Sequence, residues 1–359
     1  MPRNRVISQS QAIYVGQNGP SGAHSGAGTL QEMIRVQSAN YSFSTNTTDI
    51  NTYGKLGRIG RIHSDTPTVS FDMTYLIAGM RNESGLGFKV DGTTTAIEFL
   101  LDKTKDVKNI FELTVPEGED AQGYDIVTTP DNGKVMGIGN ASISSYTAEG
   151  AVGGLATASV SFEALNMKGM TSATGIVPAV NPTNGLEISN VVYQIPNAAG
   201  NTTLPDAIQP GDITVTIGGD AALFQDMSSV PIQSFNLSVD MARESTKKLG
   251  LRFDFSKDLS FPISATLSVD ALVSDVGTGN LATLLCNDNQ YDLQVDLREP
   301  DCNNTGDIVA RYELKNANLD SQNFAGSIGP NQTISVTWSA QVGGPQDTTN
   351  GLFMSGHIT

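Results

Sequence analysis

Two stretches of the chain alternate between apolar and polar residues. Residues 36–44 read VQSANYSFS, and residues 232–240 read IQSFNLSVD, at an offset of 196. Alternation of this kind is typical of a β-strand that buries one face. The polar positions agree as well as the apolar ones, because Gln37, Ser38, Asn40 and Ser42 recur as Gln233, Ser234, Asn236 and Ser238. The pattern predicts two equivalent strands.

A second pair of similar stretches lies further along the chain. Residues 140–164 align without a gap to residues 316–340, at an offset of 176. Apolar alternation is kept between them, and identical residues include Asn140/Asn316, Gly150/Gly326, Gly153/Gly329 and Val160/Val336.

Three weaker matches fall between these two in the same order. Residues 69–75 match 263–269 at an offset of 194, residues 96–101 match 281–286 at 185, and residues 111–115 match 291–295 at 180. The offset decreases steadily from 196 to 176. This indicates a duplicated module whose first copy has the longer loops.

Each copy is expected to contain several strands and one short helix. Apolar residues at helical spacing behind Thr or Asn predict helices over 94–104 and 279–287. A Gly-, Pro- and Asn-rich stretch at 170–186 separates the copies. We therefore predict a mainly β protein of two tandem β-sandwich or barrel-like modules, residues 1–175 and 176–359, each with a long loop after its first core strand.

The composition agrees with a mainly β fold and limits the classes of function to be considered. The 359 residues include 37 Gly, only 16% are charged, and the net charge is −16. A nucleic-acid-binding protein normally carries a basic surface, because phosphate neutralisation supplies most of its affinity. No stretch has the apolar length of a transmembrane helix, and no apolar segment of a secretory signal follows the first residues. We expect neither membrane binding nor tight nucleic-acid binding.

Basic residues are concentrated in the two long loops at 49–66 and 241–259. These loops contain eight of the 21 Lys and Arg residues and only five of the 37 acids. Long loops in compact domains are usually functional or mobile. We expect the loops to reach an acidic surface on a neighbouring subunit, so that assembly would be sensitive to salt. The candidate residues are Lys55, Arg58, Arg61, Arg243, Lys247, Lys248, Arg252 and Lys257.

The polar face of the predicted strands contains no Lys or Arg. An ordinary solvent-facing sheet usually includes lysines, which add solubility and protect edges. We interpret this face as the lining of a channel for DNA, where few cations mean few phosphate contacts. The alternative is a solvent face that happens to be rich in Ser and Thr. The candidate residues are Ser38, Asn40, Ser42, Ser70, Asp72 and Thr74 in the first module, and Ser234, Asn236, Ser238, Asp240, Ser264, Thr266, Ser268 and Asp270 in the second.

Sequence signals for catalysis, metals and cofactors are weak or missing. The three histidines have no partner at ligand spacing, and no P-loop, nucleophile elbow or HExxH pattern occurs. Cys286 and Cys302 lie at opposite ends of the strand predicted over 290–297, so we expect no disulfide between them. We expect a non-catalytic protein without cofactors.

Residues 35–79 resemble the opening module of phage major tail tube proteins. There a strand ends in a T-D-x-N-x-(F/Y)-G stretch, followed by a long loop and a P-x-V strand. The corresponding residues in this chain are Thr48, Asp49, Asn51, Tyr53, Gly54, Pro67 and Val69. Residues 12–22, 82–88 and 110–125 look similar too. The loop at 241–259 lacks the T-D-x-N stretch, so the two modules are expected to contact their neighbours differently.

The resemblance implies a tail-tube fold, rings stacked into a hollow tail, and passage of double-stranded DNA without specific binding. A chain with two tube modules would close a pseudo-six-fold ring with three copies. The implied partners are further copies of the chain and the tape measure, terminator and baseplate proteins. The implied location is the virion tail, assembled in the bacterial cytoplasm. Alternatives are another phage ring protein, such as a terminator, baseplate or decoration protein, and a carbohydrate-binding β-sandwich.

Overall fold

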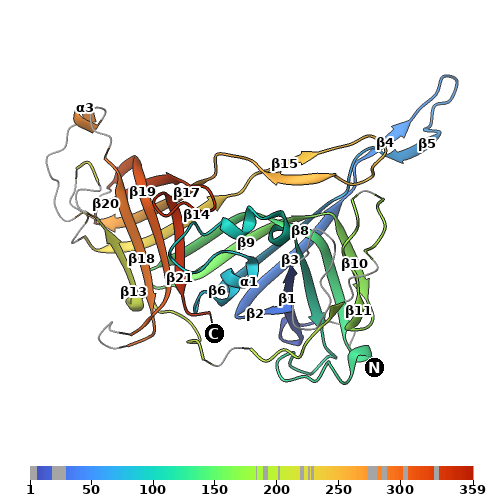
Figure 1. Ribbon diagram of the computed structural model, residues 1–359, viewed down its shortest axis with the longest axis horizontal. Helices are drawn as coiled ribbons and strands as arrows, with labels where there is room; N and C mark the ends of the chain where they lie inside the picture. The colour runs from blue at the N-terminus through green and yellow to red at the C-terminus, as the bar shows by residue number, and fades with distance from the viewer. Residues whose placement is uncertain are drawn as a thin grey trace.

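The computed structural model is built mainly of β-strands (Figure 1), which confirms the predicted fold class. It describes residues 6–17, 30–182, 184–188, 193–200, 203–218, 222–224, 227, 230–273, 281–284, 289–301, 306–326 and 331–358. Cys286 and Cys302 lie outside these residues, so the expectation about them stays a prediction.

The first half of the chain contains most of the short helical turns. Its strands are β1 (Gln11–Gln17), β2 (Leu30–Met33), β3 (Val36–Ser44), β4 (Thr47–Ile50), β5 (Gly60–His63), β6 (Thr68–Leu76), β7 (Lys108–Thr114), β8 (Lys134–Ala151), β9 (Thr157–Ala164), β10 (Asn166–Met170) and β11 (Thr174–Ile176). Its helices are η1 (Ser8–Ser10), α1 (Arg81–Leu86), η2 (Glu98–Leu100), α2 (Lys103–Asp106) and η3 (Pro130–Asn132).

The second half repeats much of this order. Its strands are β12 (Tyr193–Gln194), β13 (Ile213–Ile217), β14 (Ile232–Asp240), β15 (Arg243–Thr246), β16 (Ser256–Leu259), β17 (Ser264–Leu272), β18 (Tyr291–Arg298), β19 (Ile308–Ala325), β20 (Thr333–Gln341) and β21 (Gly351–Gly356). Its helices are η4 (Pro210–Asp212) and α3 (Leu281–Leu284).

A continuous antiparallel sheet runs through both halves, in the order β3-β6-β9-β8-β14-β17-β20-β19. We call it the central sheet. The two halves join where β8 pairs with β14. Strands of both halves therefore belong to one hydrogen-bonded layer.

β8 and β19 each leave the central sheet and continue into a second, outer sheet. The first part of β8 pairs with β7 and β10, and the first part of β19 pairs with β18 and β21. The switch occurs at Asn140 and Asn316, whose φ angles are 55° and 53°. Asn tolerates this left-handed conformation better than most residues. That tolerance explains why Asn occurs at this position in both halves.

The strand pairings of the central sheet recur in the two halves. β8 pairs with β9, and β19 with β20, in the same register at an offset of 176, with a bulge at Ser144 and again at Asp320. β3 pairs with β6, and β14 with β17, at an offset of 196. The offset of 194 predicted for 69–75 is therefore wrong by two residues. A shift of two leaves the alternation intact, so the pattern alone cannot detect it.

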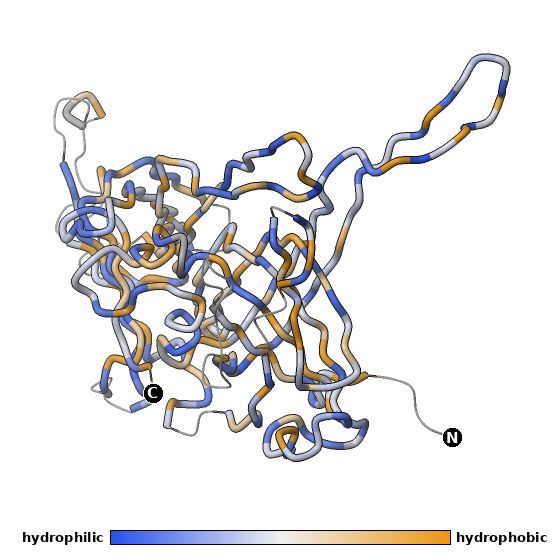
Figure 2. Tube along the Cα trace, turned by 45° about the vertical axis from the view of Figure 1, so that its right-hand side comes forward, coloured by the Kyte–Doolittle hydropathy of each residue, from blue (hydrophilic) through white to orange (hydrophobic). Residues whose placement is uncertain are grey.

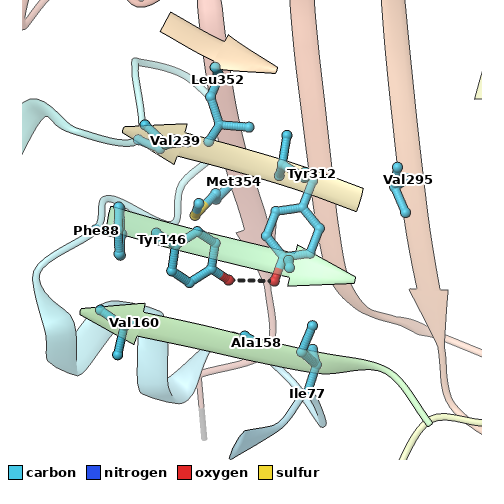
Figure 3. Close-up of a cluster of buried hydrophobic side chains, with 14 of the residues drawn as sticks. Ile77, Phe88, Tyr146, Ala158, Val160, Val239, Val295, Tyr312, Leu352 and Met354 are labelled. Carbon is cyan, nitrogen blue, oxygen red and sulfur yellow. Dashed lines mark hydrogen bonds between the residues drawn. The ribbon is translucent and has the colours of Figure 1, made fainter. Parts of the chain in front are cut away.

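The core between the layers contains a tyrosine cluster that joins the halves (Figure 3). Tyr146 of β8 and Tyr312 of β19 are fully buried, and their hydroxyls are 2.8 Å apart. Both Tyr75 and Tyr146 donate hydrogen bonds to Oε1 of Glu83, at 2.8 and 2.9 Å. Burial raises the pKa of Glu83. A neutral carboxyl group is therefore favoured in the core.

The helix predicted over 94–104 is wrong as a single element. The structure has the 3-10 turn η2 and the short helix α2 there, and α1 forms upstream instead. Thr93 and Thr94 donate their backbone N–H groups to Asp91, which holds the start of this segment in a turn. In the second half, α3 occupies the described part of the helix predicted over 279–287.

Residues beyond the predicted module boundary still contact the first half. Tyr193 and Ile195 pack in a cluster with Tyr14 and Phe111, and Arg35 donates to the backbone oxygen of Leu204. The boundary at 175 and 176, which follows from the repeat, stays a prediction.

Candidate functional site: a polar face and two open edges

All of the predicted channel-lining residues lie on one face of the central sheet, which we call the polar face. In β6, β14 and β17 they alternate with buried residues such as Phe71, Leu237 and Leu267, which point to the core. No predicted residue of the face is buried in the chain. The structure brings together residues from β3, β6, β14 and β17, namely Ser38, Asn40, Ser42, Ser70, Asp72, Thr74, Ser234, Asn236, Ser238, Asp240, Ser264, Thr266, Ser268 and Asp270.

The polar face is wider than the sequence reading proposed, because β8, β9 and β20 contribute to it. Their cross-strand partners place Glu149 beside Asn236 and Glu163 beside Ser70. The alternation of 157–164 was visible in the sequence, so its polar positions could have been assigned to the same face. The additional residues are Ser145, Thr147, Glu149, Thr157, Ser159, Ser161, Glu163, Ser335, Thr337 and Ser339.

Short side chains on this face bond mainly to one another. Ser234 donates to Asp270 at 2.8 Å, and Ser42 and Ser70 are 2.8 Å apart. None of the strand positions assigned above to the polar face is Lys or Arg. One cation reaches the face from outside, because Lys257 lies 3.2 Å from Glu163. The face therefore offers carboxylates, which repel phosphate groups, and uncharged hydroxyls, which do not neutralise them.

The junction between the halves shows how this sheet can be extended. At this junction β14 covers the edge of β8, with Leu237 opposite Ala148 and Val239 opposite Tyr146. Leu237 and Val239 are each only 1% exposed.

β3 is equivalent to β14 and has no strand on its outer edge among the described residues. Tyr41 and Phe43 take the places of Leu237 and Val239, and they are 38% and 63% exposed. The difference arises because, among the described residues, no strand pairs with the outer edge of β3 as β8 pairs with β14. At the other end of the sheet, the last part of β19 pairs with no further strand among the described residues. Its Phe324 is 39% exposed, and the Phe324 ring lies 6.4 Å from the ring of Phe224.

A groove runs along the open edge of β3, between β3 and β1. Its volume is about 640 Å³, and Ile13, Val36 and Ala39 are among its lining residues. The equivalent space between β13 and β14 is only about 60 Å³. It is closed by the end of β8, where Gly150 packs against Phe235 and Ile213. The groove thus lies where a strand equivalent to β8 would pack beside β3.

The two basic loops predicted from the sequence are β-hairpins rather than irregular loops. β4 pairs with β5, and β15 pairs with β16. β4–β5 projects away from the rest of the molecule, whereas β15–β16 lies over the first half (Figures 1 and 2).

The cations of β15–β16 contact acids of the same chain. Arg243 forms a buried ion pair with Asp106 at 2.6 Å, Lys247 pairs with Asp65 at 2.6 Å, and Lys257 pairs with Glu163. Lys248 lies over the Phe255 ring, and Arg252 is exposed. These ion pairs lie within one chain, and a contact of this hairpin with a neighbouring subunit stays a prediction.

The cations of β4–β5 lie in the projecting hairpin. Arg58 and Arg61 both lie near Asp49, at 3.0 and 3.4 Å, and Lys55 is exposed. A contact of these residues with a neighbouring subunit stays a prediction.

Within the described part of the chain, no group of three or more His, Cys, Asp or Glu residues is arranged to hold a metal ion. Among the same residues, no helix is long and apolar enough to cross a membrane.

No protein-family model matches the chain, and no curated protein matches it. Solved structures with a limited likeness include the following two. A chain of the anti-feeding prophage (AFP) baseplate is 11% identical, with a TM-score of 0.28, over 41% of this chain and 93% of that chain. The SPP1 tail tube is 15% identical, with a TM-score of 0.25, over 42% of this chain and 81% of that chain.

Proposed function

We propose that the chain is a structural protein of a phage tail, and that its copies join edge to edge into rings that stack as a hollow tube. The sequence resemblance to tail tube proteins suggests this role. The geometry supports it through one observation in particular: among the described residues, the central sheet has two unpaired edges, which correspond to the two sides of its own internal junction.

The internal junction supplies the register of the proposed contact. By the offsets of 196 and 176, β3 takes the place of β14 and the end of β19 takes the place of β8. Tyr41 of one copy would then lie opposite Phe324 of the next copy. This pair corresponds to Leu237 and Ala148, which lie opposite each other at the internal junction. The contact would cover the two exposed aromatic residues and fill the groove beside β3.

Because the two edges differ, this contact is head to tail, and it forms a ring when the rotation closes. Each chain would contribute two equivalent wedges, one from each half, so three chains would give a pseudo-six-fold ring. The duplication of the module is part of this proposal.

The polar face would line the inside of the ring and conduct DNA. Asp72, Glu149, Asp240 and Asp270 would repel phosphate groups, and serine and threonine hydroxyls would keep the surface wetted. Passage without specific binding requires this lack of cations.

Electron microscopy of the purified protein tests the proposal. We expect hollow rings or tubes in negative stain, with three-fold averages that show six lobes in end-on views. A protein that remains monomeric at every concentration, or that forms compact particles without a central hole, would refute it.

A further inference from the structure

The two open edges of the central sheet repeat one pair of residues from the internal junction with the sizes exchanged. At the internal junction Phe235 of β14 lies opposite Gly150 of β8, and its diagonal neighbour on the same face of β8 is Ala148. On the open edges, Ala39 of β3 takes the place of Phe235, and Phe324 of β19 takes the place of Ala148. Both pairs consist of one phenylalanine and one alanine, but the phenylalanine lies on opposite sides.

The internal junction has no room for a second phenylalanine. Phe235 is 3% exposed, and Ala148 is fully buried. A Cβ atom at Gly150 would lie only 2.7 Å from the Phe235 ring and 3.1 Å from the side chain of Ile213. The space left there is about 60 Å³. A phenylalanine in place of Ala148 would therefore overpack this junction.

The edge of β3 has the opposite character. Ala39 is half-buried and lines the groove of about 640 Å³ together with Ile13 and Val36. Gln11 and Glu112 also line the groove, and the Gln11 amide donates a hydrogen bond to the Glu112 carboxyl group at 3.0 Å. An aromatic ring that enters the groove therefore covers polar groups that already have a partner, which costs less than burying unpaired ones.

Phe324 lies on the side of the sheet from which the groove can be filled. Its cross-strand partner Ile334 is fully buried, and the partner of Ala39, Met73, is 1% exposed, so both residues belong to the core side of the central sheet. The Phe324 ring is 39% exposed and lies against Phe224 of its own chain. Diagonal neighbours in an antiparallel pair are roughly 7–8 Å apart, which an aromatic side chain can span.

We propose that this exchanged pair specifies which sheet edges join: Phe324 of one copy inserts into the groove beside Ala39 of the next copy, and Phe235 excludes it from the edge of β14. This inference rests on the ring described under the proposed function. Each edge then rejects the wrong strand, since β19 against β14 would place two phenylalanines in one site, and β8 against β3 would leave the groove unfilled. The internal junction and the junction between copies therefore do not compete.

Exchanging the two residues back tests the proposal. Ring formation is measured by native mass spectrometry and sedimentation over a concentration series. Ala39→Phe should raise the assembly midpoint about tenfold or more, because the added ring takes the place of Phe324. Phe324→Ala should raise it about tenfold, because the groove stays unfilled. The double variant A39F/F324A rebuilds the internal arrangement of Phe235 and Ala148, so it should assemble within about threefold of the wild type rather than with the sum of both losses.

A matched control separates rescue from a general effect of removing a phenylalanine. Phe261 is 60% exposed and lies outside the strands, so A39F/F261A should assemble as poorly as A39F. Thermal unfolding of each variant below its assembly midpoint checks the fold, and Ala39→Leu replaces A39F in the same cycle if A39F is destabilised. Wild-type assembly of A39F, or additive losses in A39F/F324A, overturns the inference and leaves the ring intact. Absence of rings from the wild-type protein refutes the ring itself, and the exchanged pair with it.

Discussion

The open edge of β3 makes a quantitative prediction about Tyr41. This residue is 38% exposed in the single chain, whereas its counterpart Leu237 is 1% exposed at the internal junction. A tyrosine buries about 200 Å² when fully covered, so the proposed contact would remove about 75 Å² of Tyr41 from water. At about 25 cal/mol per Å², Tyr41→Ala should weaken each contact by about 2 kcal/mol, or about 25-fold in affinity.

Ring formation is measured over a concentration series, by light scattering and by electron microscopy of the same samples. Tyr41→Phe separates area from hydrogen bonding, because Tyr41 bonds to the carboxyl group of Glu112. The phenylalanine variant keeps the aromatic ring, so the concentration at which it assembles should lie within about threefold of the wild-type value. Val127→Ala is the control, since Val127 is similarly exposed but lies in a turn outside the strands.

The edge-pairing argument has a clear point of failure. If Tyr41→Ala assembles as the wild type does, or if Val127→Ala loses as much affinity, β3 is not the contact. If Phe324→Ala leaves assembly unchanged while Tyr41→Ala weakens it, the register taken from the internal junction is wrong.

Three further predictions concern the polar face and the core. Replacing Asp240 and Asp270 with Lys should slow DNA release from assembled particles and make it salt-dependent, because each lysine adds a phosphate contact; unchanged ejection kinetics would count against the channel. Burial raises the pKa of Glu83 above its ordinary value of 4.5. The stability that the protonated Glu83 contributes is therefore fully present below pH 4.5 and is lost as the pH rises through the raised pKa. Glu83→Gln should therefore flatten the pH dependence of urea unfolding above about pH 4.5, and an unaltered profile would disprove the assignment. Arg243→Ala should cost roughly 3 kcal/mol or more in urea unfolding, because it leaves Asp106 buried without its partner; a loss below about 1 kcal/mol would show that the pair does not hold the hairpin.

The amino-acid sequence by itself determined which residues share a face. Period-two alternation assigned Ser38, Asn40 and Ser42 to the same side of a strand, and the structure places them there because successive side chains of a strand must point in opposite directions. The mainly β fold followed from the same alternation. The repeated Asn140 and Asn316 were visible as identities, although their role at the switch between sheets was not.

Tertiary structure decided what alternation cannot specify, namely which strands are neighbours and in which register. A slip of two residues preserves every face, so the offset of 194 looked as good as 196. The pairing of β8 with β14 joins segments distant in the sequence, and no local pattern signals it. The same holds for Arg243, which looked like a surface cation but pairs with Asp106 in a buried contact. Local hydrogen bonds to Asp91 broke the helix predicted over 94–104, because helix propensity is a weak preference that such bonds can override.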